Sequence, residues 1–102
     1  MAEIVFHKEH TKEEELNLLL TETGEMAELV VYNDDVNTFD WVIKCLMEIC
    51  QHSSEQAEQL SLLIHFKGKA IVQTAPFDVL KPRKDALTER GLSAVIESTA
   101  KS

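Results

Sequence analysis

The chain has 102 residues, which is enough for one domain with a modest core and too few for a multidomain protein. Hydrophobic residues make up 44% of it, which argues against wholesale disorder, and the formal net charge of −8 argues against a nucleic-acid partner and an anionic membrane surface. An acidic surface is compatible with cationic ligands, although solubility alone is its more common explanation.

The two cysteines favour a reducing compartment. Cys45 and Cys50 are five residues apart within one helical pattern, so their side chains point in different directions and a disulfide between them would be strained. Free thiols are typical of proteins kept under reducing conditions. No apolar run approaches the roughly 18 residues that a transmembrane helix needs. We therefore predict a cytoplasmic protein with no membrane partner.

The first 27 residues differ in character from the rest. A charge run covers 11–15, and 21–25 is polar with a glycine. We predict that 1–27 is a mobile N-terminal extension with a helical piece around Glu13–Leu20. An amphipathic helix docked on the domain is the equally supported alternative. The core domain is expected over 28–98 and a C-terminal tail over 99–102.

The first half of the core predicts a strand followed by two helices. The β-branched and aromatic run at 28–32 is typical of a buried strand. Apolar residues then recur at helical spacing over 38–51, with Asn37 or Thr38 as the N-cap. Ser53 and Gln56 fit a capping box that begins a second helix, which should end at Gly68.

The second half predicts a strand at 69–74, a helix within 77–90 and a strand at 92–96. Pro82 should either kink this third helix or mark its true first turn. The element order is thus β-α-α-β-α-β. Short connections favour an α+β sandwich, in which a three-stranded antiparallel sheet carries its helices on one face.

Asn33, Asp34 and Asp35 form a polar cluster at the first strand-to-helix junction. Such residues ordinarily serve turn chemistry, and a histidine such as His65 near a helix end ordinarily satisfies the last carbonyls. If the two helices form a hairpin packed on the first strand, however, His65 returns to the vicinity of Asn33. An amide oxygen, carboxylates and an imidazole would then match the three N–H donors of a protonated α-amine.

Apolar residues beside this cluster are candidates for a pocket wall: Phe39, Val42, Ile64 and Leu92. A metal site is the lesser alternative, because no recognised zinc spacing occurs among His7, His10, His52, His65, Cys45 and Cys50. A hydrolase is weaker still, since Ser61 lies one turn before His65 without a placed triad. We predict no catalytic residue, metal or cofactor.

Three segments together resemble the ClpS adaptor family of the bacterial N-end rule. They are Val30–Asp35, Thr38–Val42 and Leu63–Ala70, the last of which contains a His-x-x-Gly-Lys run. The resemblance covers about residues 28–98 and implies the same β-α-α-β-α-β fold. It implies a non-catalytic adaptor that binds protein substrates through a destabilising N-terminal residue, an N-degron. The adaptor would pass them to a Clp AAA+ unfoldase of ClpA or ClpC type and its peptidase.

The resemblance also assigns roles to individual residues. Asn33, Asp34, Asp35 and His65 would hold the substrate α-amine, and Asn37 would contact the peptide backbone. The side-chain pocket would consist of Phe39, Val42, Ser61, Ile64 and Leu92. Asp78 and Arg83 would contact the N-domain of the unfoldase, which the N-terminal extension would help to engage. The protein is expected to be a monomer.

Two residues depart from the family pattern. Phe39 replaces a methionine that gates the pocket, and Ser61 replaces a pocket-lining methionine. The preferred first residue of the substrate is therefore open. The alternative from another class is a small docking domain, similar in fold to the C-terminal domain of ribosomal L7/L12, that does not recognise a free N-terminus.

Overall fold

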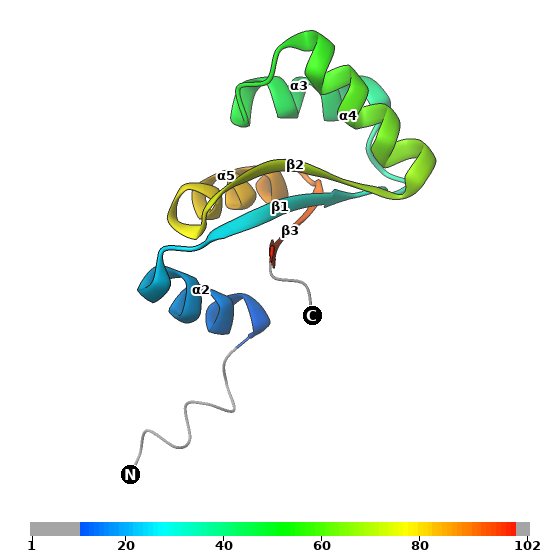
Figure 1. Ribbon diagram of the computed structural model, residues 1–102. Coiled ribbons are helices and arrows are strands. Elements are labelled where there is room, and N and C mark those ends of the chain that lie inside the picture. Colours follow the sequence, from blue (N-terminus) through cyan, green and yellow to red (C-terminus); the bar gives the residue numbers. More distant parts are fainter. Residues whose placement is uncertain (1–10, 100–102) are drawn as a thin grey trace.

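The three strands form one antiparallel sheet with the order β2-β1-β3 in the computed structural model, which describes residues 11–99 (Figure 1). The strands are β1 (Met26–Tyr32), β2 (Lys69–Pro76) and β3 (Ser93–Ser98). The helices are α2 (Lys12–Thr23), α3 (Phe39–Ile49), α4 (Ser54–Lys67) and α5 (Phe77–Glu89). From β1 onward the predicted element order and the α+β class are confirmed.

The central strand β1 has one face in the core. Ala27, Leu29 and Val31 belong to the main apolar cluster, which also includes buried side chains of all four helices. On the opposite face, Ile71 and Val95 beside β1 are 48% and 39% exposed. The helices therefore bury one face of the sheet, as the sequence predicted.

Local signals fix the ends of the helical hairpin. The Thr38 side chain accepts from Trp41 N and caps α3, and Ser53 and Gln56 form the expected capping box of α4. Gly68 ends α4 with a φ of 93°, a conformation that favours glycine. In Figure 1 the α3–α4 hairpin lies toward the β2 side of the sheet, and α4 contacts β2.

Helix α5 rules out one of the two alternatives that the sequence left open for Pro82. The helix begins at Phe77, five residues earlier, so Pro82 lies in its interior and does not mark the first turn. Buried Phe77, Leu80 and Leu87 pack the helix on the sheet. Pro82 cannot donate a backbone hydrogen bond. The three buried side chains, which lie before and after Pro82, stabilise the helix on both sides of it.

Helix α2 packs against β3 and α5. Its Thr11–Glu14 capping box is complete, and Leu20 is 2% exposed within the core cluster. Glu13 is paired with Lys81 at 3.1 Å and with Lys84 at 2.9 Å on α5. Helix α2 is therefore the docked helix that the sequence analysis gave as the alternative to a loose extension. Strand β1 begins at Met26, two residues before the expected boundary at 28. Mobility of the extension and the tail at 99–102 stay predictions, and residues 1–10 and 100–102 lie outside the described residues.

Candidate functional site

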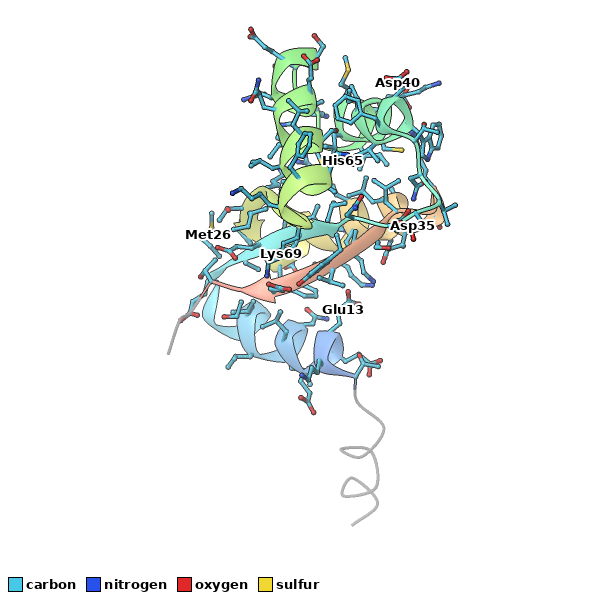
Figure 2. The ribbon with its side chains drawn as sticks, turned by 90° about the vertical axis from the view of Figure 1, so that its right-hand side faces the viewer. Glu13, Met26, Asp35, Asp40, His65 and Lys69 are labelled. Carbon is cyan, nitrogen blue, oxygen red and sulfur yellow. The ribbon has the colours of Figure 1, made fainter. Side chains whose placement is uncertain are left out.

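Sheet pairing brings the end of α4 to the end of β1. Tyr32 pairs with Lys69 across the sheet, and Asn33 N donates to Gly68 O at 2.9 Å. Because Gly68 is the C-cap of α4, the last turn of that helix lies beside the segment that follows β1. His65 is in that last turn. Figure 2 shows His65 on α4 and Asp35 on the loop after β1 at the same end of the molecule.

A cavity of about 300 Å³ lies between these segments. Its polar lining comes from the junction and the helix end: Asn33, Asp34, Asp35, Asn37 and His65. Its apolar lining comes from α3 and α4, apart from one hydroxyl: Phe39, Val42, Ile64 and Ser61. The volume is at the lower end of the range for small-ligand pockets. The two distant stretches that the sequence joined by a hairpin argument thus line one cavity.

Leu92 is the predicted wall residue that does not line this cavity. It is buried in a small adjoining hollow that shares five lining residues with the cavity: Asn33, Asp34, Asn37, Val42 and Ile64. Leu92 therefore lies close to the cavity without lining it. Asp78 and Arg83 lie on α5 and line neither hollow.

The Asp34 carboxylate organises the loop. Its Oδ1 accepts from Val36 N at 2.9 Å and Asn37 N at 3.0 Å, and its two oxygens accept from Asn37 Nδ2 at 3.1 and 2.9 Å. Ser93 Oγ donates to Oδ2 at 3.2 Å. The backbone N–H of Asn37 is the largest cause that lowers the pKa of Asp34 below its ordinary value. The group is therefore an anion held in place by its own turn.

Asn37 links this loop to the start of β3. Its Nδ2 donates to Asp34 and also to Gly91 O at 2.8 Å, so its two amide hydrogens are engaged within the protein. The Oδ1 atom of Asn37 is the group that can meet a ligand, and it is an acceptor only. Gly91 has a φ of 93°, which explains a glycine at this position.

Asp35 and His65 have exposed side chains at the cavity, and Asn33 is exposed as well. The ring of His65 meets Phe66 edge-on, with centroids 4.8 Å apart. These three side chains offer amide, carboxylate and imidazole acceptors, and apolar side chains line the same cavity. The arrangement can hold a cation that carries an apolar group.

Sequence reasoning missed the partners of Asp34 and Asn37 near residue 91. Ser93 and Gly91 carry no motif, and they become visible only once β3 pairs with β1. The one available signal was that polar residues occur near the start of the third predicted strand, which could pair beside the Asn33–Asp35 cluster.

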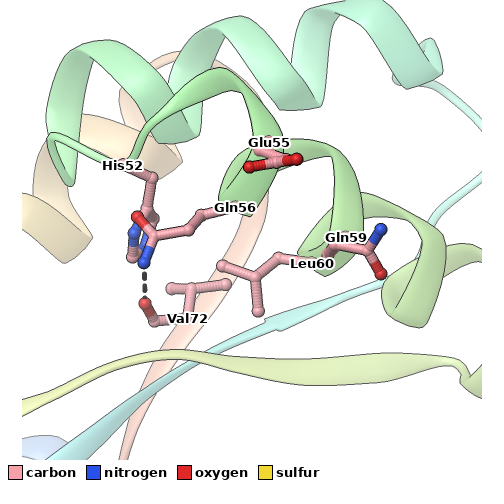
Figure 3. A pocket seen from close by; sticks show the side chains of 6 residues that line it. All are labelled: His52, Glu55, Gln56, Gln59, Leu60 and Val72. Atoms are coloured by element: carbon pink, nitrogen blue, oxygen red, sulfur yellow. Dashed lines mark hydrogen bonds between the residues drawn. The ribbon is translucent and has the colours of Figure 1, made fainter.

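A larger hollow of about 640 Å³ lies elsewhere, along β2 and the first turns of α4 (Figure 3). His52 Nε2 is 2.6 Å from Val72 O there, at the extra residue of a β-bulge. None of the predicted amine-binding or pocket residues lines this hollow, and two of its polar side chains already have partners within the protein: His52 Nε2 bonds Val72 O, and Gln56 Oε1 accepts from Ser53 N. We therefore place the site in the smaller cavity.

The side chains of residues 11–20 and 24–99 form no cluster of three potential His, Cys, Asp or Glu metal ligands; His7 and His10, named as candidates from the sequence, lie outside these ranges. Cys45 and Cys50 are free and buried. Over residues 11–99, none of the helices has the length and apolarity that crossing a bilayer requires.

Comparison with known proteins decides the family. The sequence model described as "ATP-dependent Clp protease adaptor protein ClpS" matches residues 22–95. The chain belongs to the ClpS family. ClpS proteins are adaptors of the Clp protease, so the chain's place in proteolysis follows from its family.

Individual ClpS relatives agree with this assignment. The chain is 36% identical over 66 residues to the ClpS adapter of Thermosynechococcus vestitus, covering 64% of this chain and 70% of that protein. It is 27% identical over 82 residues to the ClpS adapter of Neisseria meningitidis serogroup A, covering 80% of each.

A solved structure shares the fold. Agrobacterium tumefaciens ClpS2 bound to L-phenylalaninamide matches with a TM-score of 0.67 at 20% sequence identity, over 72% of this chain and 96% of that one.

Proposed function

We propose that this ClpS protein binds the free α-amino group and the bulky hydrophobic first side chain of N-degron substrates. Asn33, Asp35 and His65 would accept from the protonated amine, and Asp34 would contribute its charge while holding the loop. The first side chain would enter between Phe39, Val42 and Ile64. The observation that carries the proposal is a single cavity that is lined both by acceptors and by apolar side chains.

The chemistry of this cavity suits a chain terminus. A protonated α-amine offers three N–H donors, and charge-assisted hydrogen bonds contribute about 1.5–3 kcal/mol each. L-Phenylalaninamide, the ligand of the Agrobacterium ClpS2 structure, combines a free α-amine with an aromatic side chain. The backbone of the peptide would pass Asn37, whose Oδ1 can accept from a peptide N–H.

The bound substrate would then be delivered to a Clp AAA+ unfoldase of ClpA or ClpC type in the cytoplasm. Asp78 and Arg83 on α5 would contact the unfoldase N-domain, and the N-terminal segment would assist delivery. The protein would act as a monomeric, non-catalytic adaptor without a cofactor.

One titration tests the amine proposal. A fluorescent peptide that begins with free Phe is titrated with the full chain, beside the same peptide N-acetylated. Acetylation removes the charge and two of the three donors, so we expect at least a tenfold loss of affinity. Equal binding of both peptides would instead support a docking domain that ignores the free N-terminus.

A variant links this result to the cavity. His65→Ala should weaken binding of the free-Phe peptide about tenfold or more, and Tm should change little because the imidazole is exposed. Lys67→Ala, in the same last turn of α4 but outside the cavity lining, is the matched control. A large loss of Tm in His65→Ala with unchanged affinity per folded molecule would contradict a binding role.

A further inference from the structure

Ser61 carries a buried hydroxyl that has no partner. Ser61 is 2% exposed and lines the cavity of the candidate site. Its Oγ makes no hydrogen bond with any of the described residues. Among the side chains of residues 11–20 and 24–99, the one other such atom is Gln73 Oε1, which does not line the cavity. A buried polar group without a partner is costly, so native proteins rarely keep one.

Apolar side chains line the same cavity as this hydroxyl: Phe39, Val42 and Ile64. None of the charged or amide side chains of the lining makes a hydrogen bond with Ser61 Oγ. Ser61 and His65 are four residues apart on α4, so they lie on one face of the helix and one turn apart. A side chain anchored by its amine beside His65 and extended along α4 would bring its far end to Ser61.

We propose that Ser61 determines specificity by favouring a first residue whose far end carries a hydrogen-bonding group, foremost the phenolic hydroxyl of tyrosine. This inference rests on the proposed function of the same cavity. A serine hydroxyl and a phenol can each donate and accept, so they satisfy one another. A phenylalanine in the same position excludes water and leaves the serine unpaired.

The small volume of Ser61 and its hydroxyl group predict different substrate preferences. The small volume enlarges the cavity, which would favour any large first side chain. Tyrosine and phenylalanine differ by one oxygen atom. Their relative affinity therefore isolates the hydrogen bond from the volume of the cavity.

The test compares two labelled peptides that are identical except for Tyr or Phe at the free N-terminus. Fluorescence anisotropy with the full chain should give a Kd about three- to tenfold lower for the Tyr peptide, the value of one added hydrogen bond. In Ser61→Ala the ratio should fall to about one, chiefly through weaker binding of the Tyr peptide. Ser54→Ala, an exposed serine at the start of the same helix, should leave the wild-type ratio intact.

The outcomes separate this inference from the function on which it rests. Equal affinity of the two peptides for the wild type, or a Tyr preference that persists in a folded Ser61→Ala protein, would overturn the role of Ser61 while free and acetylated peptides still differ. Failure to bind either free peptide would overturn the amine proposal itself. The ratio of the Kd values of the Tyr and Phe peptides is measured on the wild-type protein. It therefore tests the role of Ser61 even if Ser61→Ala folds poorly.

Discussion

Replacement of Asp34 and replacement of Asp35 should affect different properties of the protein, although the two aspartates are adjacent. The Asp34 carboxylate accepts from four donors, three in its own loop and one at the start of β3: Val36 N, Asn37 N, Asn37 Nδ2 and Ser93 Oγ. Asp35 is exposed at the cavity. We therefore expect Asp34→Ala to affect mainly stability and Asp35→Ala mainly the affinity for a free N-terminus.

The magnitude follows from the contacts of Asp34. At roughly 0.5 kcal/mol for each of four donors at a half-buried site, Asp34→Ala should lower the free energy of unfolding by about 2 kcal/mol. For a domain of this size that corresponds to a fall in Tm of about 10 °C. Asp35→Ala should keep Tm within about 2 °C of the wild type, since surface substitutions rarely change stability by more than about 0.5 kcal/mol.

The pH dependence supplies an independent check. The pKa of Asp34 is lower in the folded state than its ordinary value. Its carboxylate therefore stabilises the fold above the unfolded-state pKa of about 3.9, and this contribution is lost as the pH falls through the lower folded-state pKa. The gap in Tm between the wild type and Asp34→Asn should narrow as the pH falls below about 4.

Thermal melts followed by circular dichroism, together with peptide titrations, measure both effects. A Tm for Asp34→Ala within about 2 °C of the wild type would refute the loop role. So would an equal fall in Asp35→Ala, because that residue lacks the four donors.

Three further predictions concern stability and reactivity. Leu20→Ala should lower the free energy of unfolding by about 3 kcal/mol in a urea titration, because Leu20 is 2% exposed in the core; an unchanged midpoint would mean that α2 does not stay docked. Gln51 has a φ of 62°, so Gln51→Gly should raise stability by up to about 1 kcal/mol, whereas Gln51→Val should lower it, and the reverse order in urea would contradict the left-handed conformation. Burial raises the pKa of the Cys50 thiol to about 11, so iodoacetamide at pH 8 should modify Cys50 far more slowly in the native protein than in urea, and equal rates would contradict burial.

The elements and caps of the α3–α4 hairpin could be predicted because their signals are local. Ser53 with Gln56, and Gly68, act within a turn of the helix end that they define. Pro82 was harder, since its local rule favours a helix start or a kink. The buried side chains of Phe77 and Leu80 precede it, and their packing on the sheet sets the start of α5 instead.

Composition around 11–25 could not settle whether this segment docks, because the outcome depends on partners far along the chain. The charge run resembles a solvated extension, yet Glu13 meets Lys81 and Lys84 on α5. Likewise, the sequence indicated turn chemistry or amine binding for Asp34, but it did not indicate Ser93 as a partner. The contact with Ser93 that anchors its loop to β3 requires the sheet to form.

Formation of the sheet also positions the two segments that line the candidate site, the loop after β1 and the last turn of α4. The hydrogen bond from Asn33 N to Gly68 O continues the pairing of β1 with β2, so sheet register itself sets the position of the last turn of α4 relative to the acceptors. Asn37 binds Gly91 O and thereby ties the other side of the loop to β3. Because the sheet already positions the loop and the helix end, these segments lose little conformational entropy when a cation binds. Exposed side chains on them, such as Asp35 and His65, can therefore contribute to affinity. The requirement for a free amine would then arise from the β-sheet as much as from the side chains that contact it.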